Sequence, residues 1–232
     1  MTFDDLFAEY YTQYRAEAQT PASTDDEYTV FLRYANSAIN RWENYDATYW
    51  KELFTTLQDS TQVSPVLVTT ISTGVSEYDA PTNMREAGGL IDVKNSDGRV
   101  VQQYPIINPQ EAQFRDAQST YAYFTGNPTD GFTLHLNPAP TSNLNGLDID
   151  YVYYKKATKF VSGGSETTEM ANPMFIVHHA LYPRFRASRN PYLNTALRDA
   201  EEALKNMQQD NNSGTWANPP TVGDTSITEW GM

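Results

Sequence analysis

The chain has no cysteine among its 232 residues, so disulfide bonds and thiolate metal sites are excluded. It also has little basic character, because 16 Lys and Arg residues stand against 29 Asp and Glu residues, for a net charge of −13. A protein that binds nucleic acid by itself normally carries a basic face, whereas Lys and Arg are scattered along this chain. Tight binding to DNA phosphates is therefore not expected.

Long apolar runs are missing as well. No run approaches the roughly 18 apolar residues of a membrane span, and residues 1–11 have neither the basic nor the apolar region of a signal peptide. We therefore expect a protein made in reducing cytoplasm, without a membrane partner. Aromatic side chains are plentiful, with 16 Tyr, 10 Phe and 4 Trp, and they supply the burial that aliphatic residues usually provide.

Helical patterns open the chain. A capping box at Thr2 precedes an aromatic stripe and predicts a helix over residues 2–18. A second helix is predicted over about residues 24–43, because its apolar residues recur at spacings of four and three. That stripe consists of Phe31, Ala35, Ala38 and Trp42. Asp46 is expected to cap a third helix that extends to Leu57.

The middle of the chain loses this helical period and gains β-branched and aromatic residues between turn signals. Asp97 followed by Gly98 is typical of a hairpin turn. Alternating apolar residues in 131–136 and in 147–154 indicate strands with one buried face. Several short strands at this spacing predict an antiparallel sandwich or a small barrel.

Helical patterns return after residue 162. Asn172 followed by Pro173 predicts the start of one helix, and a last amphipathic helix is expected to end near Met207. Pro183 is expected to kink or interrupt the first of these two. The order of segments predicts an α+β fold, a helical bundle with an inserted antiparallel β-sandwich or barrel-like lobe. The expected parts are residues 1–62 and 162–208 for the bundle, 63–161 for the β lobe and 209–232 for an extended C-terminal arm.

This C-terminal arm combines a polar composition rich in Pro, Gly and Asn with large apolar side chains. Such a segment does not build a core of its own, yet buried tryptophans are frequent anchors of protein interfaces. We therefore expect the arm to become ordered when it docks on a partner. The expected docking residues are Trp216, Val222, Ile227 and Trp230.

No catalytic or metal-binding group of residues stands out from its structural explanation. His178 and His179 are adjacent, so on a helix they point about 100° apart and do not easily share one metal. Asp148 and Asp150 lie on one strand face, as a carboxylate pair of a glycoside hydrolase does, but solvated strand residues are the simpler explanation. The sequence therefore predicts no enzyme activity, no cofactor and no metal.

Several stretches together resemble a known family. They are residues 32–36 in a helix that reaches Trp42, the run Thr70–Pro81 with Gly74, Glu77 and Tyr78, the strand 147–154, and residues 174–185 before a final helix rich in Glu and Ala. The combination is similar to the head-to-tail adaptor (connector) proteins of tailed bacteriophages, including the tail-tubular-A type of short-tailed phages. It covers roughly residues 24–208.

This resemblance implies a structural virion protein without catalysis or a cofactor. Adaptors of this family form a ring, usually a dodecamer, that docks under the portal protein ring and joins the DNA-filled head to the tail or nozzle proteins. The implied location is the neck of the virion, after assembly in the host cytoplasm. An acidic chain suits a channel through which genomic DNA passes without specific binding. Two alternatives remain open: another tail-completion or stopper protein, and a carbohydrate-binding or receptor-binding module built on the Tyr-rich strands.

Overall fold

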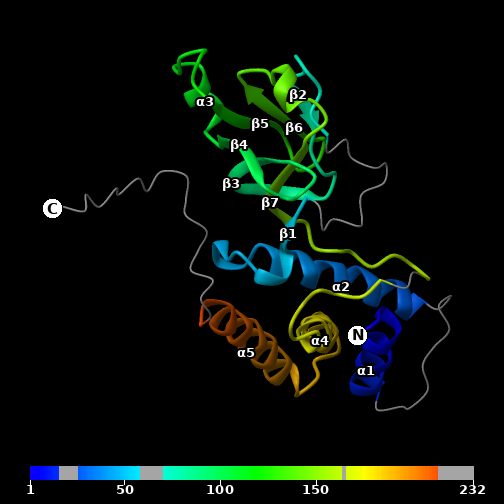
Figure 1. Cartoon of the computed structure of the whole chain (residues 1–232). Helices are drawn as coiled ribbons and strands as arrows, with labels where there is room; N and C mark the ends of the chain where they lie inside the picture. Colours follow the sequence, from blue (N-terminus) through cyan, green and yellow to red (C-terminus); the bar gives the residue numbers. More distant parts are fainter. Residues whose placement is uncertain (16–25, 58–69, 164–165, 214–232) are drawn as a thin grey trace. The chain divides into compact units, whose positions relative to one another are not determined.

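The computed structural model describes residues 1–15, 26–57, 70–163 and 166–213 (Figure 1). The chain divides into two compact units. Residues 1–53 form a helical unit together with the segment that begins at Ala157, and the intervening residues 54–156 form a β unit. The predicted α+β class is confirmed, because helices and antiparallel sheets occupy separate parts of the chain.

Four α-helices make up the described part of the helical unit: α1 (Phe3–Arg15), α2 (Asp26–Glu43), α4 (Met174–Ser188) and α5 (Leu193–Asn212). Helix α4 lies between α1 and α5 and also contacts α2 (Figure 1). The stripe predicted in α2 is buried along its whole length, so its 4-3-4 spacing does mark the core face of that helix.

The core between α1 and α2 consists largely of aromatic rings. Phe31 is fully buried, and its ring centroid lies 5.3 Å from that of Phe3, 5.5 Å from that of Phe7 and 4.7 Å from that of Tyr10. The hydroxyl of Tyr10 donates a hydrogen bond of 2.6 Å to Glu27 on α2. The buried polar end of Tyr10 is therefore satisfied, as burial of a tyrosine requires.

The capping box predicted at the start of α1 is confirmed. The backbone N–H of Asp5 donates to Oγ1 of Thr2 at 3.2 Å, and the backbone N–H of Thr2 donates to Oδ2 of Asp5 at 3.0 Å. The hydrogen bonds from Thr2 lower the pKa of the Asp5 carboxyl. These bonds satisfy two N–H groups that a helix terminus leaves without intrahelical partners.

The structure decides two points about the later helices. Helix α4 continues past Pro183 to Ser188, so of the two outcomes expected for this proline, interruption does not occur. Helix α5 extends to Asn212, five residues beyond the expected end at Met207. The extra turn has a structural role, because the side chain of Asn211 is buried and binds backbone groups of residues 49 and 51, at 2.9 Å each.

The third helix predicted from Asp46 to Leu57 is wrong. This stretch forms two short 3-10 turns, η1 (Tyr45–Ala47) and η2 (Lys51–Leu53), followed by the strand β1 (Phe54–Thr56). Asp46 has a φ of 47°, in the left-handed region, and therefore does not cap a helix. Contacts with other elements explain the difference, because α5 binds the turns and β1 pairs with a strand nearly a hundred residues away.

The β unit contains two antiparallel sheets. The strand order is β1-β7-β3-β4 in the first sheet and β2-β6-β5 in the second. The strands beyond β1 are β2 (Glu77–Asp79), β3 (Met84–Lys94), β4 (Val100–Pro105), β5 (Tyr121–Asn127), β6 (Gly131–Asn137) and β7 (Asp148–Lys155). A short helix α3 (Pro109–Ala112) and a 3-10 turn η3 (Ser142–Leu144) lie in the connections.

One hydrophobic core is shared by the two sheets. Ile91 and Tyr153 of the first sheet belong to it, as do Leu134 and Leu136 of the second. The alternation predicted for residues 131–136 and 147–154 is thus confirmed on the core side. The sheets are not closed into a barrel, so the barrel-like alternative is wrong and an open pair of packed sheets is the observed arrangement.

The hairpin predicted at Asp97-Gly98 is confirmed and joins β3 to β4. The side chain of Asn95 accepts hydrogen bonds from the backbone N–H groups of Asp97, at 3.1 Å, and Arg99, at 2.9 Å. Gly98 has a φ of +75°, which residues other than Gly rarely adopt. The pairing register shifts between Val93 and Lys94, so β4 begins with a bulge.

Candidate partner-binding surfaces

The four residues predicted to dock on a partner, Trp216, Val222, Ile227 and Trp230, all lie outside the described residues. Their role stays a prediction. The described residues, however, include exposed apolar side chains that the sequence patterns did not single out. Isolated exposed apolar residues are ordinary on protein surfaces, whereas groups of them often mark interfaces.

One such group consists of Val100 and Val101 at the start of β4, whose side chains are 46 % and 49 % exposed. Leu90 on β3 is 42 % exposed but lies opposite Pro105, at the other end of β4. The strand β4 has the sequence Val-Val-Gln-Gln-Tyr-Pro, which contains no charged residue. The uncharged run is visible in the sequence, whereas the position of β4 at the edge of a sheet, which makes the run a candidate surface, comes from the structure.

A second exposed apolar side chain is Phe114, which is 87 % exposed in the loop after α3. Hydrogen bonds hold this loop in place. Nδ2 of Asn137 donates to the carbonyl oxygens of Ala117, at 3.1 Å, and Ser119, at 2.7 Å. Because the loop is already held in place, binding of a partner to the exposed Phe114 would cost little loop conformational entropy.

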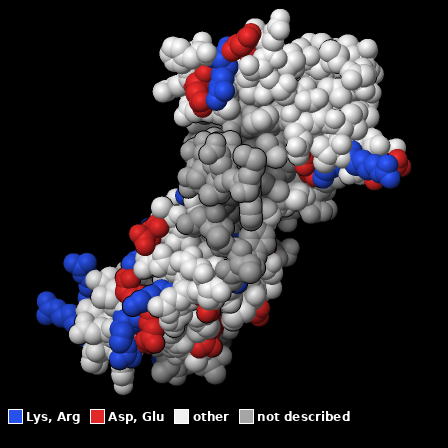
Figure 2. All heavy atoms as spheres, turned by 60° about the vertical axis from the view of Figure 1, so that its left-hand side comes forward, with Lys and Arg blue, Asp and Glu red and all other residues white. Residues whose placement is uncertain are grey.

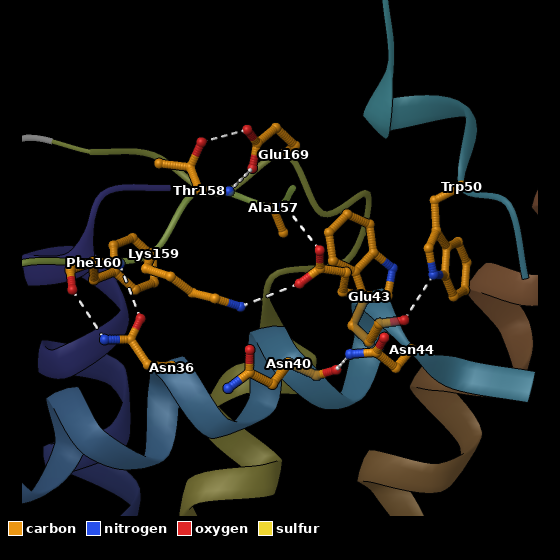
Figure 3. Close-up of polar contacts among 11 residues, drawn as sticks. Asn36, Asn40, Glu43, Asn44, Trp50, Ala157, Thr158, Lys159, Phe160 and Glu169 are labelled. Atoms are coloured by element: carbon orange, nitrogen blue, oxygen red, sulfur yellow. Dashed lines mark hydrogen bonds and ion pairs between the residues drawn. The ribbon is translucent and has the colours of Figure 1, made fainter. Parts of the chain in front are cut away.

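In the helical unit, one surface of α2 is already occupied by the chain itself (Figure 3). The amide of Asn36 donates to the carbonyl of Phe160 and accepts from its N–H, both at 2.9 Å. At the C-terminal end of α2, the buried carboxylate of Glu43 makes two further contacts with the same segment. It accepts hydrogen bonds from the N–H of Ala157 and from Nζ of Lys159, both at 3.4 Å. The side of α2 that carries Asn36 and Glu43 is therefore covered by residues 157–160 and is not free to bind a partner.

The charged residues are mixed in sign. On the face in Figure 2, Lys and Arg lie among Asp and Glu and do not form a basic patch of their own. Several are paired, as in Arg41 with Glu201 and Arg115 with Glu111. The face in view therefore lacks the basic stripe that accompanies binding to nucleic acid.

Of the two acidic residues on β7 that were predicted to be solvated, Asp148 is partly exposed and Asp150 is buried, so the prediction is wrong for Asp150. Asp150 is only 8 % exposed, and its Oδ2 accepts a hydrogen bond of 2.5 Å from Nζ of Lys94, which raises the pKa of that lysine. Asp92 lies opposite Asp150 in the register and accepts from Nε2 of Gln103 at 2.9 Å. The first explanation failed because the neighbouring strand supplies a cation, so Asp150 takes part in a structural ion pair within the sheet.

The two adjacent histidines lie partly buried in α4. Burial lowers the pKa of both, to about 4 for His179, whose ring centroid is 5.6 Å from that of Phe175. In the described ranges, no group of three or more His, Cys, Asp or Glu residues is arranged to hold a metal ion. None of the helices described here is long and apolar enough to cross a membrane.

Comparison with known proteins adds one finding. The model of the SU10 adaptor protein family matches residues 1–223, which is nearly the whole chain. No curated protein matches the sequence. The match includes both the helical unit and the β unit, so it concerns the complete arrangement of elements described above.

Proposed function

The chain belongs to the SU10 adaptor protein family, a family of phage adaptor proteins, and on this basis we propose that it is a head-to-tail adaptor of a tailed phage. In this proposal, copies of the chain form a ring beneath the portal protein. The family is structural, which implies a non-enzymatic role. The observation that carries the proposal is the family match over residues 1–223.

The proposed ring is a dodecamer at the neck of the virion, assembled in the host cytoplasm. It binds the portal ring on one side and tail or nozzle proteins on the other, and it forms part of the channel for genomic DNA. The net charge of −13 supports the channel, because a wall that repels phosphates lets DNA slide without sticking. The exposed apolar groups around Val101 and at Phe114 supply surfaces for contacts between subunits.

The C-terminal segment is part of this proposal. Trp216, Val222, Ile227 and Trp230 are proposed to anchor it on the portal or on a neighbouring copy, since each large apolar side chain contributes on the order of 1.5–3 kcal/mol when it is buried. Deletion of residues 209–232 would also remove Asn211, which binds backbone groups near Tyr49. A test of docking therefore needs point substitutions such as Trp230→Ala.

A tail-completion or stopper protein belongs to the same broad class and differs in where it sits in the virion. A carbohydrate-binding module is less well supported by the structure, because a sugar platform needs exposed aromatic rings. The tyrosines of the strands are largely buried in the sheets instead, among them Tyr78, Tyr104, Tyr121, Tyr151, Tyr153 and Tyr154.

The test combines the protein with purified portal rings. Mass measurement in solution and negative-stain images are expected to show a monomer or weak oligomer alone and a complete ring on the portal. Portal without adaptor is the control for the portal's own outline. A small oligomer of fixed size that does not bind the portal but binds glycans would contradict the proposal and support the carbohydrate-binding alternative.

A further inference from the structure

The strand β4 forms one edge of the four-stranded sheet. Its pairing register with β3 places Gly89 opposite Ile106, and the N–H of Ile106 donates to the carbonyl of Gly89 at 3.4 Å. Because bonded and non-bonded pairs alternate along an antiparallel ladder, Gln103 belongs to a non-bonded pair. Its N–H and C=O therefore point away from β3, toward the open edge.

The edge is closed at only one end. Just beyond β4, Ile106 forms a bridge with Ala122, and the N–H of Ile107 donates to the carbonyl of Ala122 at 2.9 Å. The remaining part, around Val101 and Gln103, receives no backbone partner at this edge from the described residues. The carbonyl of Gln103 accepts a bond of 3.2 Å from the side chain of the adjacent Gln102, which a donor strand would displace or share. About five residues of strand edge are thus open to solvent, flanked by the half-exposed side chains of Val100 and Val101.

An open edge of this kind favours pairing with another extended segment, and proteins usually protect such edges with charge, a bulge or a cover. Here β4 carries no charge. Only the bulge at Val93 and Lys94 and the proline at position 105 interrupt it. An assembly of many copies exposes this edge many times, so a specific occupant in the assembly is expected.

We propose that this edge accepts a strand from the C-terminal segment of a second copy, formed by residues 226–230 around Ile227. The inference rests on the proposed function, because it describes how adjacent subunits of the ring are joined. A ring requires contacts between two different surfaces of neighbouring subunits, whereas pairing of β4 with its own copy yields only a two-fold dimer. A separate donor segment meets this requirement.

Three properties of the C-terminal segment favour it as the donor. Nineteen residues, 214–232, follow the described end of the chain, and an extended chain spans roughly 3.3 Å per residue. The run Ile227–Trp230 contains β-branched and aromatic residues and matches the length of the open edge. Residues 214–232 carry Asp224 and Glu229 but no Lys or Arg, while the exposed Arg99 lies at the start of β4.

Strand addition combines backbone hydrogen bonds with side-chain contacts on alternate residues. In this pairing the outward N–H and C=O of Gln103 bind the backbone of the donor, and Val101 covers the apolar side chain of Ile227. The absence of charge on β4 then has a function, since a buried charge at this contact would need a partner of its own.

Because the chain has no cysteine, single cysteines can be placed without side reactions. One full-length variant carries Val101→Cys and a tag, and a second carries Ile227→Cys. The two are mixed with portal rings, and separately at high concentration without portal, and treated with a short bismaleimide. The expected product is a cross-linked pair of chains at a yield at least five-fold above that of a control pair in which Tyr192→Cys, an exposed site on the helical unit, replaces Val101→Cys.

A backbone substitution tests the hydrogen bonds. Gln103→Pro removes the outward N–H and keeps the backbone bonds to β3, and Pro105 already occupies an equivalent position of the same strand. It also removes the side-chain bond from Gln103 to Asp92, which Gln103→Ala removes as well, so the alanine variant is the matched control. The cross-link is expected to fall at least five-fold in Gln103→Pro but not in Gln103→Ala. Melting temperatures of both variants identify any loss of folding, and a folded Gln103→Pro protein with unchanged cross-linking overturns the proposal.

Three further outcomes separate this inference from the proposed function and from pairing within one chain. If rings form on the portal but the 101–227 product stays at the control level in both mixtures, the donor assignment is wrong and the adaptor function stands. If the double variant Val101→Cys/Ile227→Cys cross-links within one chain at high dilution, the occupant is the chain's own segment and the contact between copies is refuted. Cross-linking at high concentration without ring formation on the portal supports the strand pairing and counts against the proposed function.

Discussion

At the scale of single residues, Phe31 has the environment in which loss of a side chain costs most. It is fully buried and is surrounded by three aromatic rings of α1. Phe31→Ala is expected to lower the free energy of unfolding by about 3–5 kcal/mol, because the removed ring leaves a cavity. Urea denaturation measures this loss.

Phe114 provides the matched control, since it is the same residue type at 87 % exposure. Phe114→Ala is expected to change the free energy of unfolding by less than about 0.5 kcal/mol. Equal effects of the two substitutions would show that the aromatic core between α1 and α2 is assigned wrongly.

His179 makes stability depend on pH. Burial, reinforced by the nearby charge of Arg41, lowers its pKa from 6.5 to about 4 in the folded protein. Between these two values the unfolded chain binds a proton that the folded chain does not, so stability is fully present above pH 6.5 and is lost as the pH falls toward 4. The expected loss is on the order of 1–3 kcal/mol after allowance for partial exposure.

The measurement compares the wild type with His179→Gln by urea denaturation at several pH values from 7 to 5. The variant is expected to show a shallower decline of stability in this window, because its side chain does not titrate. Parallel declines in the two proteins would mean that other groups, among them His178, cause the whole effect.

Residue-level prediction from sequence succeeded where the partners are close in the chain and failed where they are distant. The capping box of Thr2 and Asp5 needs only three residues of separation, and it formed as predicted. Asp150 was predicted to be solvated, yet its partner Lys94 is 56 residues away, on a strand whose register the sequence does not reveal.

At the scale of elements, the contact between α2 and the segment after β7 can be tested with two asparagines on one helix. Asn36 binds the backbone of Phe160 through both a donor and an acceptor, whereas the side chain of Asn40, one turn later, is exposed (Figure 3). Asn36→Ala is expected to cost about 1–3 kcal/mol, since it leaves a backbone N–H and C=O without their partners.

Asn40→Ala is the control and is expected to be neutral within about 0.5 kcal/mol, because Ala is a better helix former than Asn. Thermal melts and urea denaturation of both variants give the comparison. If Asn40→Ala is as destabilising as Asn36→Ala, the contact with Phe160 does not account for the loss of stability.

The elements themselves were predicted best where one periodicity persists over many residues. Helix α2 is an example, because its stripe continues from Phe31 to Trp42. The stretch 46–57 also has helically spaced apolar residues, but it adopts turns and a strand because α5 and β7 bind it. Local spacing cannot reveal that choice, which depends on tertiary contacts that outweigh helix propensity.

At the scale of the whole molecule, the acidic charge predicts weak interaction with DNA. With a net charge of −13, the isolated protein is expected to bind duplex DNA with a Kd weaker than roughly 1 µM at physiological salt, and binding should weaken further as salt is added. Fluorescence anisotropy with labelled duplexes measures both. Sub-micromolar affinity that persists at physiological salt would contradict a channel wall that repels DNA.

The overall order of helices, strands and helices could be predicted from sequence, because changes of periodicity along the chain are visible without knowledge of contacts. The open arrangement of the two sheets could not. Whether short strands close into a barrel depends on which strands become edges. β1 became one edge of the larger sheet by pairing with the distant β7, and β4 became the other because its hairpin partner β3 also pairs with β7.

The strands through which the chain enters and leaves the β unit are hydrogen-bonded neighbours, with Phe54 of β1 opposite Tyr154 of β7. The whole insertion therefore begins and ends within about one strand spacing, roughly 5 Å. An ancestral chain could acquire, enlarge or exchange such a cassette without separating the ends of the helices that flank it. The same geometry gives a protein engineer a graft point, at which a lobe from a relative, or a simple two-residue turn, can replace the native insertion.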